Sequence, residues 1–390
     1  MLRSIRVPYL ANLFVVGALL ASSSAARATP CAQFSGPCTY VPNPTDYPNV
    51  QSDVMGSFEF AAQPLTDDDV SSENGEDLDY WPTADQGDAN DYLAYHYSGS
   101  TNPRLVVVLP GSGQTPGKYT HFMTRAAHHG FNVIGLMYKN DVPEVNCVDL
   151  HSNNVAECQY VQHRFDFQGT PIPTEYTGPN SPHMPLAGYA GVPGYNSVSH
   201  RLGQLLKYLN HNFPGQGWGR FLGADGESIA WNSGVIVVGH SHGGGVATFG
   251  AQANAFDRLI MFDSTPVTVD TDTPPSAVIF AKLDQPGGTK SSNAYGASWA
   301  NSSANAWDLV HARLNWNAQH LAGGEVDPDH VAPSGHRLVG SALFPGGING
   351  CAPSEPLSKS GHYKMVMDSC EPTATNNWNY MSTWDYLLGF

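Results

Sequence analysis

Residues 239–243, GHSHG, place one serine between two histidines, inside a pair of glycines. Two kinds of chemistry are open to these side chains. In an extended chain, His240 and His242 would lie on the same face of a strand and could share a metal ion. If the chain turns sharply at Ser241, the serine hydroxyl is exposed and can serve as a nucleophile. A metal site needs more ligands, whereas the sequence continues with glycines, so we interpret the motif as a nucleophilic serine.

The residues on either side of this motif predict a strand before Ser241 and a helix after it. Residues 234–239 are mainly β-branched and apolar, and many residues of 242–253 are small. This is the strand–serine–helix order of the G-x-S-x-G elbow, in which the serine has a strained backbone. Such a serine needs a base to take its proton, a carboxylate to orient that base, and N–H donors for the oxyanion.

The wider pattern predicts a mainly parallel sheet flanked by helices, which is an α/β fold. Strands are expected at 92–97, 104–110, 131–138, 234–239, 258–262, 277–283 and 337–344, and helices at 118–129, 197–213, 242–253 and 376–390. We expect one domain over 29–390, with an irregular segment at 29–90 and insertions at 140–195 and 285–335. The first insertion is interpreted as a cap over the site, because loops of such length in compact domains are usually functional.

Together these features resemble the α/β-hydrolase superfamily. The resemblance spans roughly residues 90–390 in element order. It rests on GHSHG, on VVVLPGSG at 106–113, and on the order serine, acid, histidine along the chain. It implies an α/β-hydrolase fold with cap-like insertions, a nucleophile on the elbow, an oxyanion hole, and a histidine oriented by a carboxylate.

The oxyanion loop is expected directly after the strand that ends at Pro110, where PGSGQTPG covers residues 110–117. The resemblance implies one donor N–H in this loop and a second from His242, the residue after the nucleophile. We predict the N–H of Ser112 as the first donor. The N–H of Gly113 stays open as the alternative, because Pro110 stands where many family members carry histidine.

Two aspartates follow predicted strands beyond Ser241 and could supply the acid. Asp284 follows 277–283, and Asp263 follows 258–262. Most members of the family that the chain resembles use the later position and some use the earlier one. We therefore predict Asp284 as the catalytic carboxylate and keep Asp263 as the alternative. If Asp284 is the acid, Asp263 becomes a pocket or capping residue, since DSTP is also a good turn.

The base is expected after the last strand. His362 lies late in the chain, in SGHYKMVMD, between Cys351 and Cys370. A disulfide between these cysteines would hold the loop of the histidine in place. His336 is the main rival, but it begins a predicted strand instead of ending one. We predict His362 as the base and a packed or hydrogen-bonded role for His240 in the elbow.

The N-terminus predicts export. Arg3 and Arg6 precede an apolar run at 9–21 that is short for a membrane span, and ARA at 26–28 offers small residues for cleavage. We interpret residues 1–28 as a signal peptide that is removed near Ala28, which predicts a secreted or periplasmic protein. An uncleaved anchor is the alternative.

Cysteine positions and net charge narrow the environment further. All six cysteines follow the predicted cleavage site, and proximity in sequence favours disulfides 31–38, 147–158 and 351–370. The formal charge of −16 argues against nucleic acid or an anionic membrane surface as a partner.

The sequence therefore predicts an exported serine hydrolase that cleaves carboxylic esters through an acyl-enzyme, with a small-molecule or polymeric ester as substrate and with no cofactor or metal. A peptidase or amidase of the same fold, and a secreted binding protein with a relic elbow, are the alternatives. The acyl-chain preference and the oligomeric state are not specified by the sequence.

Overall fold

The computed structural model describes residues 39–40, 60–61, 63–65, 92–96, 102–143, 145–148, 155–177, 186–190, 192, 194–264, 282–299, 306–328, 330–340, 365–366 and 381–390. These residues include Ser241, Ser112, His242 and both candidate aspartates. The proposed leader at 1–28, His362 and four of the six cysteines lie outside the described residues.

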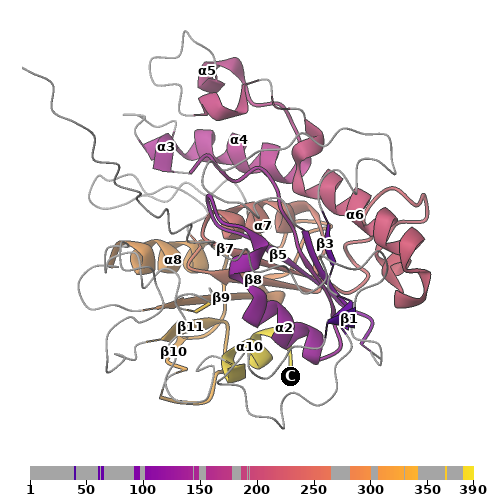
Figure 1. The fold of residues 1–390 in the computed structure, drawn as a ribbon. Helices are drawn as coiled ribbons and strands as arrows, with labels where there is room; N and C mark the ends of the chain where they lie inside the picture. Colours follow the sequence, from indigo (N-terminus) through magenta and orange to yellow (C-terminus); the bar gives the residue numbers. More distant parts are fainter. Residues whose placement is uncertain are drawn as a thin grey trace, which may run out of the picture.

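Nine strands of the described chain form one sheet through the middle of the molecule (Figure 1). Their spatial order is β10 (Glu325–Val326), β11 (Arg337–Gly340), β9 (Ala294–Trp299), β8 (Arg258–Phe262), β7 (Val235–His240), β5 (Leu105–Leu109), β6 (Asn132–Gly135), β4 (Tyr92–Tyr95) and β3 (Gln63–Leu65). Neighbours from β10 to β6 are parallel, whereas β6 with β4 and β4 with β3 are antiparallel. The carboxyl ends of β5, β7 and β8 therefore meet at one edge of the sheet. Two further strands, β1 (Thr39–Tyr40) and β2 (Phe60–Ala61), pair with each other.

Helices cover both faces of this sheet (Figure 1). On one face lie α4 (Val155–Gln168), α6 (Val198–Asn212), α7 (His242–Ala253) and α8 (Ala306–Ala318), and on the other lie α2 (Thr120–His128) and α10 (Met381–Leu388). Strand β5 shows the reason. Leu105, Val107 and Leu109 belong to the core of the first face, and Val106 and Val108 to the core of the second. A strand buried on both sides needs apolar residues at successive positions, which accounts for its unbroken apolar run.

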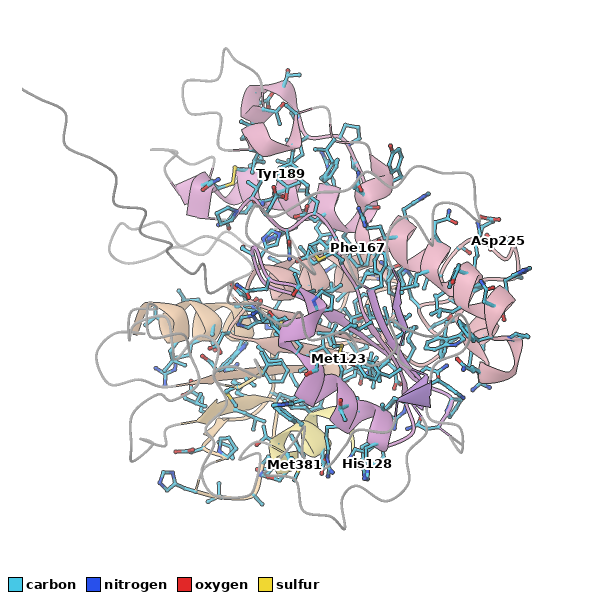
Figure 2. All side chains as sticks on the ribbon, viewed as in Figure 1. Met123, His128, Phe167, Tyr189, Asp225 and Met381 are labelled. Atoms are coloured by element: carbon cyan, nitrogen blue, oxygen red, sulfur yellow. A yellow bond between two sulfur atoms is a disulfide. The ribbon has the colours of Figure 1, made fainter. Side chains whose placement is uncertain are left out.

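The insertion at 140–195 supplies part of the helix layer. Its helix α4 packs against α7, and a Cβ added to Gly250 would lie 2.1 Å from the Phe167 ring. Figure 2 shows Phe167 on the side toward the sheet and Tyr189 farther out. Of two short helices, α5 (Thr174–Thr177) lies on the outer side of α4, and α3 (Val145–Val148) lies beside the start of α4 (Figure 1). A smaller hydrophobic cluster forms there from Val142, Cys147, Cys158, Val161, Phe165, Tyr176, Leu186 and Tyr189.

The structure pairs Cys147 with Cys158 in a disulfide whose Cα atoms are 5.8 Å apart. This is one of the three pairs expected from sequence proximity, and the other two lie outside the described residues. The bridge joins α3 to the first turns of α4. Within the described residues, no helix is both long and apolar enough to cross a bilayer.

Helix α10 docks on α2 through one carboxylate. Asp385 accepts hydrogen bonds from Nε and Nη2 of Arg125 and from Nε2 of His129. Burial raises the pKa of the Asp385 carboxyl, but the hydrogen bonds from His129 and Arg125 outweigh burial and lower that pKa to about 2. The ionised form of Asp385 thus holds the closing helix to the body of the protein.

One strand lies in a different place from the sequence prediction. Lys282 and Leu283, the described part of 277–283, are not in a strand, and the strand that follows β8 in the sheet is β9, inside the second predicted insertion. Strand β9 contains Gly296, against which Trp316 of α8 packs so closely that an added Cβ would lie 1.9 Å from its Nε1. A glycine inside a strand weakens the strand pattern, which explains why the sequence does not reveal β9.

Candidate active site

Ser241 occupies the turn between β7 and α7. Its φ of 53° and ψ of −121° lie in a region that non-glycine residues rarely adopt, at a cost of about 1–3 kcal/mol. Its N–H donates to the Phe262 carbonyl of β8 at 2.9 Å, and its carbonyl accepts from Gly244 N–H at 2.9 Å. Ser241 remains partly exposed, whereas His240 and His242 are buried. The strand–serine–helix turn expected from the sequence is therefore present.

Glycines allow the elbow to pack this closely. A Cβ added to Gly239 would lie 2.2 Å from the Gly243 carbonyl oxygen, and one added to Gly243 would lie 2.2 Å from the Leu109 carbonyl oxygen. A Cβ on Gly244 would lie 2.4 Å from Ser264 Oγ. The glycines around Ser241 thus bring the start of α7 against the ends of β5 and β8.

The loop after β5 lies against the nucleophile. A Cβ added to Gly111 would stand 3.2 Å from Ser241 Cβ. Three amides of this loop already donate within the protein: Gly111 N–H to the Tyr119 hydroxyl, Gly113 N–H to the Asn140 carbonyl, and Gln114 N–H to the Gly111 carbonyl. The described residues provide no acceptor for the Ser112 N–H, so of the two donors left open by the sequence, Ser112 has the amide that is not already used.

Side chains from the segment after β6 hold this loop in shape. Asn140 Nδ2 donates to the carbonyls of Gly111 at 2.9 Å and Gln114 at 2.8 Å, and the Tyr138 hydroxyl donates to the Pro110 carbonyl at 2.8 Å. Asn140 is 1% exposed, so these bonds are shielded from water. The loop backbone is fixed before any substrate arrives, which is the condition that an oxyanion donor must meet.

His240 joins the same loop to the elbow. It is buried, and its Nδ1 lies 2.8 Å from the Tyr119 hydroxyl, which also accepts from Gly111 N–H. The hydrogen-bonded elbow role that the sequence suggested for His240 is confirmed. The imidazole of His242 has a different partner, so the two histidines do not converge on a shared site.

Asp263 directly follows the neighbouring strand, β8, and lies beside Ser241. His240 and Phe262 are paired in register, so the residues that follow them, Ser241 and Asp263, leave adjacent strands about 4.8 Å apart. Asp263 is 2% exposed and has a φ of 43°. Ser298 of β9, itself fully buried, donates from Oγ to Asp263 Oδ1 at 2.5 Å. A second non-glycine residue with positive φ thus presents a buried carboxylate at the same edge of the sheet.

Asp284, the carboxylate favoured by the sequence, lies elsewhere. It is exposed and accepts a hydrogen bond from Ser291 N–H, which lowers its pKa below the ordinary value. Its own N–H donates to Thr289, whose N–H donates to the Ala251 carbonyl at the far end of α7. Ten residues of helix separate Ala251 from Ser241, or about 15 Å. The structure thus corrects the expected location: Asp263, and not Asp284, is the candidate that lies near the elbow.

Of the two histidines considered as the base, only His336 lies in the described part of the chain. His336 precedes β11, with its Nδ1 2.8 Å from the Ala294 carbonyl at the start of β9 and its ring stacked on Tyr295. It therefore lies at the amino end of these strands, away from Ser241. His362 is outside the described residues, and its role as the base stays a prediction.

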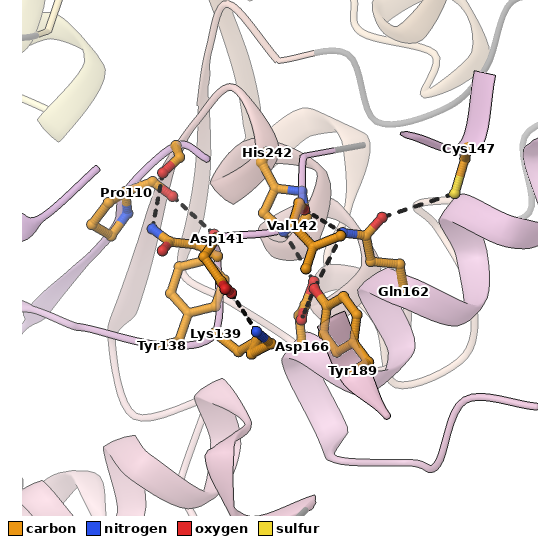
Figure 3. Close-up of polar contacts among 12 residues, drawn as sticks. Pro110, Tyr138, Lys139, Asp141, Val142, Cys147, Gln162, Asp166, Tyr189 and His242 are labelled. Atoms are coloured by element: carbon orange, nitrogen blue, oxygen red, sulfur yellow. Dashed lines mark hydrogen bonds and ion pairs between the residues drawn. The ribbon is translucent and has the colours of Figure 1, made fainter. Parts of the chain in front are cut away.

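A buried polar network lies behind His242, and no sequence pattern revealed it (Figure 3). His242 Nε2 lies 2.9 Å from Asp166 Oδ2 of α4, and Asp166 Oδ1 accepts from the Tyr189 hydroxyl at 2.8 Å. Gln162 Nε2 donates to that hydroxyl oxygen at 3.1 Å and to the Val142 carbonyl at 2.7 Å. Among the described residues, no group of three or more His, Cys, Asp or Glu side chains could hold a metal ion.

Comparisons with known proteins give loose structural similarity. No family model and no curated protein matches the sequence. Among solved structures, the dienelactone hydrolase from Anabaena variabilis is 12% identical with a TM-score of 0.29, and covers 73% of this chain and 86% of its own. TT1662 from Thermus thermophilus is 11% identical with a TM-score of 0.34 and covers 85% and 99%, and esterase 2 from Thermogutta terrifontis is 10% identical with a TM-score of 0.31 and covers 71% and 88%. At these scores the similarity assigns no activity to this chain.

Proposed function

Because the strand order of the sheet and the Ser241 elbow give this chain the α/β-hydrolase fold, we propose that it is a serine hydrolase that cleaves carboxylic esters. The observation that carries the proposal is the strained backbone of Ser241 at the turn between β7 and α7. The loop that contains Ser112 packs against Ser241, His242 begins α7, and the buried Asp263 directly follows the neighbouring strand; these three residues support the proposal. Esters are favoured over amides by analogy with the superfamily alone.

In the proposed reaction, Ser241 Oγ attacks the ester carbonyl carbon while an imidazole takes its proton. The sequence position of His362, after the last strand, makes it our candidate for that imidazole. Asp263 orients the ring and stabilises its protonated form. The oxyanion of the tetrahedral intermediate accepts hydrogen bonds from the N–H groups of Ser112 and His242.

The intermediate then collapses by breaking the bond to the alkoxide oxygen, which leaves as an alcohol with the proton from the imidazole. In the second half, the imidazole takes a proton from water, and the hydroxide attacks the acyl carbon. Cleavage of the bond to Ser241 Oγ releases the carboxylic acid and returns the proton to the serine. Water is the sole co-reactant.

A fluorophosphonate probe tests the nucleophile. We expect it to label the wild-type protein and not Ser241→Ala. A panel of p-nitrophenyl esters of increasing acyl length, run beside the matching anilides, then separates esterase from amidase. Hydrolysis of anilides alone would contradict the ester proposal. Absence of both labelling and turnover in the folded wild type would leave a binding protein as the better reading of this fold.

A matched pair of carboxamide variants tests the acid. Asp263→Asn should lower kcat by about 10³–10⁴-fold, since the imidazole then loses its orienting carboxylate. Asp284→Asn keeps the same chemical change at an exposed position and should leave kcat unchanged. The reverse pattern would restore the acid assigned from the sequence.

We also propose that the protein is exported and oxidised. The charged and apolar pattern at 1–28 and the pairing of Cys147 with Cys158 support this. Protein recovered from the medium or periplasm should begin at Thr29, as read by N-terminal sequencing. Recovery of chains that begin at Met1 from the membrane fraction would contradict cleavage.

A further inference from the structure

The side chain of His242 is hydrogen-bonded to a residue of the insertion at 140–195. Helix α4 brings Asp166 to within 2.9 Å of His242 Nε2, and the Asp166 carboxyl is fully buried. The Tyr189 hydroxyl donates to the other carboxyl oxygen at 2.8 Å. Figure 3 shows Asp166 between His242 and Tyr189, so the three side chains form one line of hydrogen bonds. With Asp166 ionised, His242 donates to it from Nε2.

The backbone of His242 is part of the candidate site. It is the first residue of α7, and first-turn N–H groups have no carbonyl four residues back in the helix to accept them. The direction in which the His242 N–H points is therefore set by the orientation of the peptide plane between Ser241 and His242. That plane also joins His242 to Ser241, whose backbone is strained. Small rotations at His242 would therefore move both Ser241 and the His242 amide, the second donor of the proposed oxyanion hole.

Tyr138 connects the same imidazole to the oxyanion loop. Its ring stacks on that of His242, with centroids 6.2 Å apart and an interplanar angle of 7°. Its hydroxyl donates to the Pro110 carbonyl, next to Gly111 and Ser112. The imidazole of His242 thus lies between α4, through Asp166, and the loop that carries the Ser112 amide.

Two basic side chains near this pair, those of His163 and Lys139, are buried, whereas Asp141 is exposed. His163 of α4 lies with its ring 5.4 Å from that of His242, and Lys139 Nζ lies 5.2 Å from the centre of the Tyr189 ring, paired with Asp141. Burial raises the pKa of the Asp166 carboxyl, and the hydrogen bond from His242 opposes that rise. Burial also raises the pKa of Tyr189 well above its usual range, so its hydroxyl stays protonated and remains a donor.

From this geometry we propose that Asp166 is a positioning residue for the reaction: through the imidazole of His242, it orients the His242 N–H toward the oxyanion and in line with the Ser112 N–H. The inference rests on the proposed function. It assigns the insertion a part in transition-state stabilisation, beyond the covering role that its sequence suggests. The effect is expected in kcat more than in KM, because the oxyanion forms after the substrate has bound.

Asp166→Asn tests the inference with p-nitrophenyl butyrate as substrate. Titration with the fluorophosphonate first counts the active sites. We expect kcat per titrated site to fall by about 10–100-fold, somewhat less than the loss of a whole oxyanion donor, with KM within about twofold. The inhibition constant of a trifluoromethyl ketone, whose adduct places an oxyanion in the same hole, should rise by the same factor as kcat/KM falls.

Two further variants make the test decisive. Tyr189→Phe removes one donor to Asp166 without touching the elbow, and should lower kcat per site in the same direction by about 3–10-fold. Glu157→Gln, an exposed carboxylate on α4, is the matched control and should behave as the wild type. If Asp166→Asn does not fold, Tyr189→Phe carries the test.

Unchanged kcat per titrated site in Asp166→Asn or, where that variant does not fold, in Tyr189→Phe overturns the inference, even if fewer sites titrate or the Tm falls, because the network would then serve stability alone. A wild-type protein that neither reacts with the probe nor cleaves the ester would instead overturn the proposed function. The two failures are therefore distinguishable.

Discussion

Replacing Gly243 by alanine tests whether the contact between the elbow and the oxyanion loop sets the rate. The added Cβ would lie 2.2 Å from the Leu109 carbonyl oxygen and 2.6 Å from that of Pro110, whereas real Cβ atoms essentially never come closer than 3.0 Å. Going from 2.2 to 3.0 Å requires α7 and the end of β5 to separate by 0.8 Å. Both neighbours are backbone atoms, so no side-chain rotation can relieve the clash.

This separation acts directly on the proposed oxyanion hole. One donor amide lies at the start of α7 and the other lies in the loop after β5, so the gap between them widens with the shift. A misplacement of about 1 Å costs on the order of 100-fold in rate, and overpacking a tight site costs about 1–3 kcal/mol of stability. We therefore expect Gly243→Ala to lower kcat by about 100-fold.

Ester hydrolysis and thermal unfolding, measured on the same preparation, check this expectation. Gly117→Ala is the control, because it makes the same glycine-to-alanine change in the loop after β5, where its new Cβ would lie 3.8 Å from the nearest atom, Thr115 Oγ1. The control should keep the wild-type kcat. A Gly243→Ala variant that retained kcat within about threefold would refute the claim that this contact positions the donors.

Three other outcomes follow from the packing. Asp385→Asn should lower the free energy of unfolding at pH 7 by about 1–2 kcal/mol, a figure that allows for the 22% solvent exposure of this carboxylate. The folded pKa of Asp385, about 2, lies below the ordinary 3.8, so the contribution is present above pH 4 and is lost as the pH falls toward 2. Urea unfolding of the wild type and the variant at several pH values measures this loss. Replacing both Cys147 and Cys158 by serine should lower the free energy of unfolding by at most about 3 kcal/mol, given a sequence separation of 11, as measured by urea unfolding of both proteins without reducing agent. Gly250→Ala should cost about 1–3 kcal/mol through its clash with Phe167, and the added change Phe167→Leu should recover part of it; equal Tm values for the single and double variants would contradict this.

The fold and the elbow follow from local patterns in the sequence. The apolar runs of β5 and β7 predict strands that are buried on both faces. The glycines around Ser241 predict a turn in which added side chains would clash with neighbouring atoms. Each of these signals lies within a short stretch of the chain. The predicted boundaries of α7 and β8 agree with the structure at every residue.

The choice between Asp263 and Asp284 as the proposed acid depends on a strand that the sequence does not reveal. The apolar stretch at 277–283 has the composition of a strand, and Asp284 follows it, while the true neighbour of β8 is interrupted by Gly296. That glycine is needed because the Trp316 indole packs against it from another element. A strand whose pattern is shaped by a distant partner cannot be recognised from its own residues.

Hydrogen bonds between residues that are distant in the sequence likewise cannot be predicted from local sequence patterns. Ser112 and Gly113 offer equivalent amides in the sequence, and what separates them is the carbonyl of Asn140, which accepts from the Gly113 N–H and not from that of Ser112. Asp166 contacts His242 although the two lie 76 positions apart in the sequence, and Asp166 belongs to the segment 140–195, which the sequence suggests is only an insertion. Both contacts exist because the fold brings separate segments together.

The double role of α4 bears on attempts to change what this protein acts upon. Exchanging the whole of 140–195 for the corresponding piece of another protein would remove Asp166 and Phe167 together with the outer loops. Such a chimera would lose the side chains that contact His242 and Gly250. Junctions placed after Gln168 and before Gly194 would keep Asp166 and Phe167, and the inserted piece would have to supply a tyrosine in place of Tyr189, whose hydroxyl donates to Asp166.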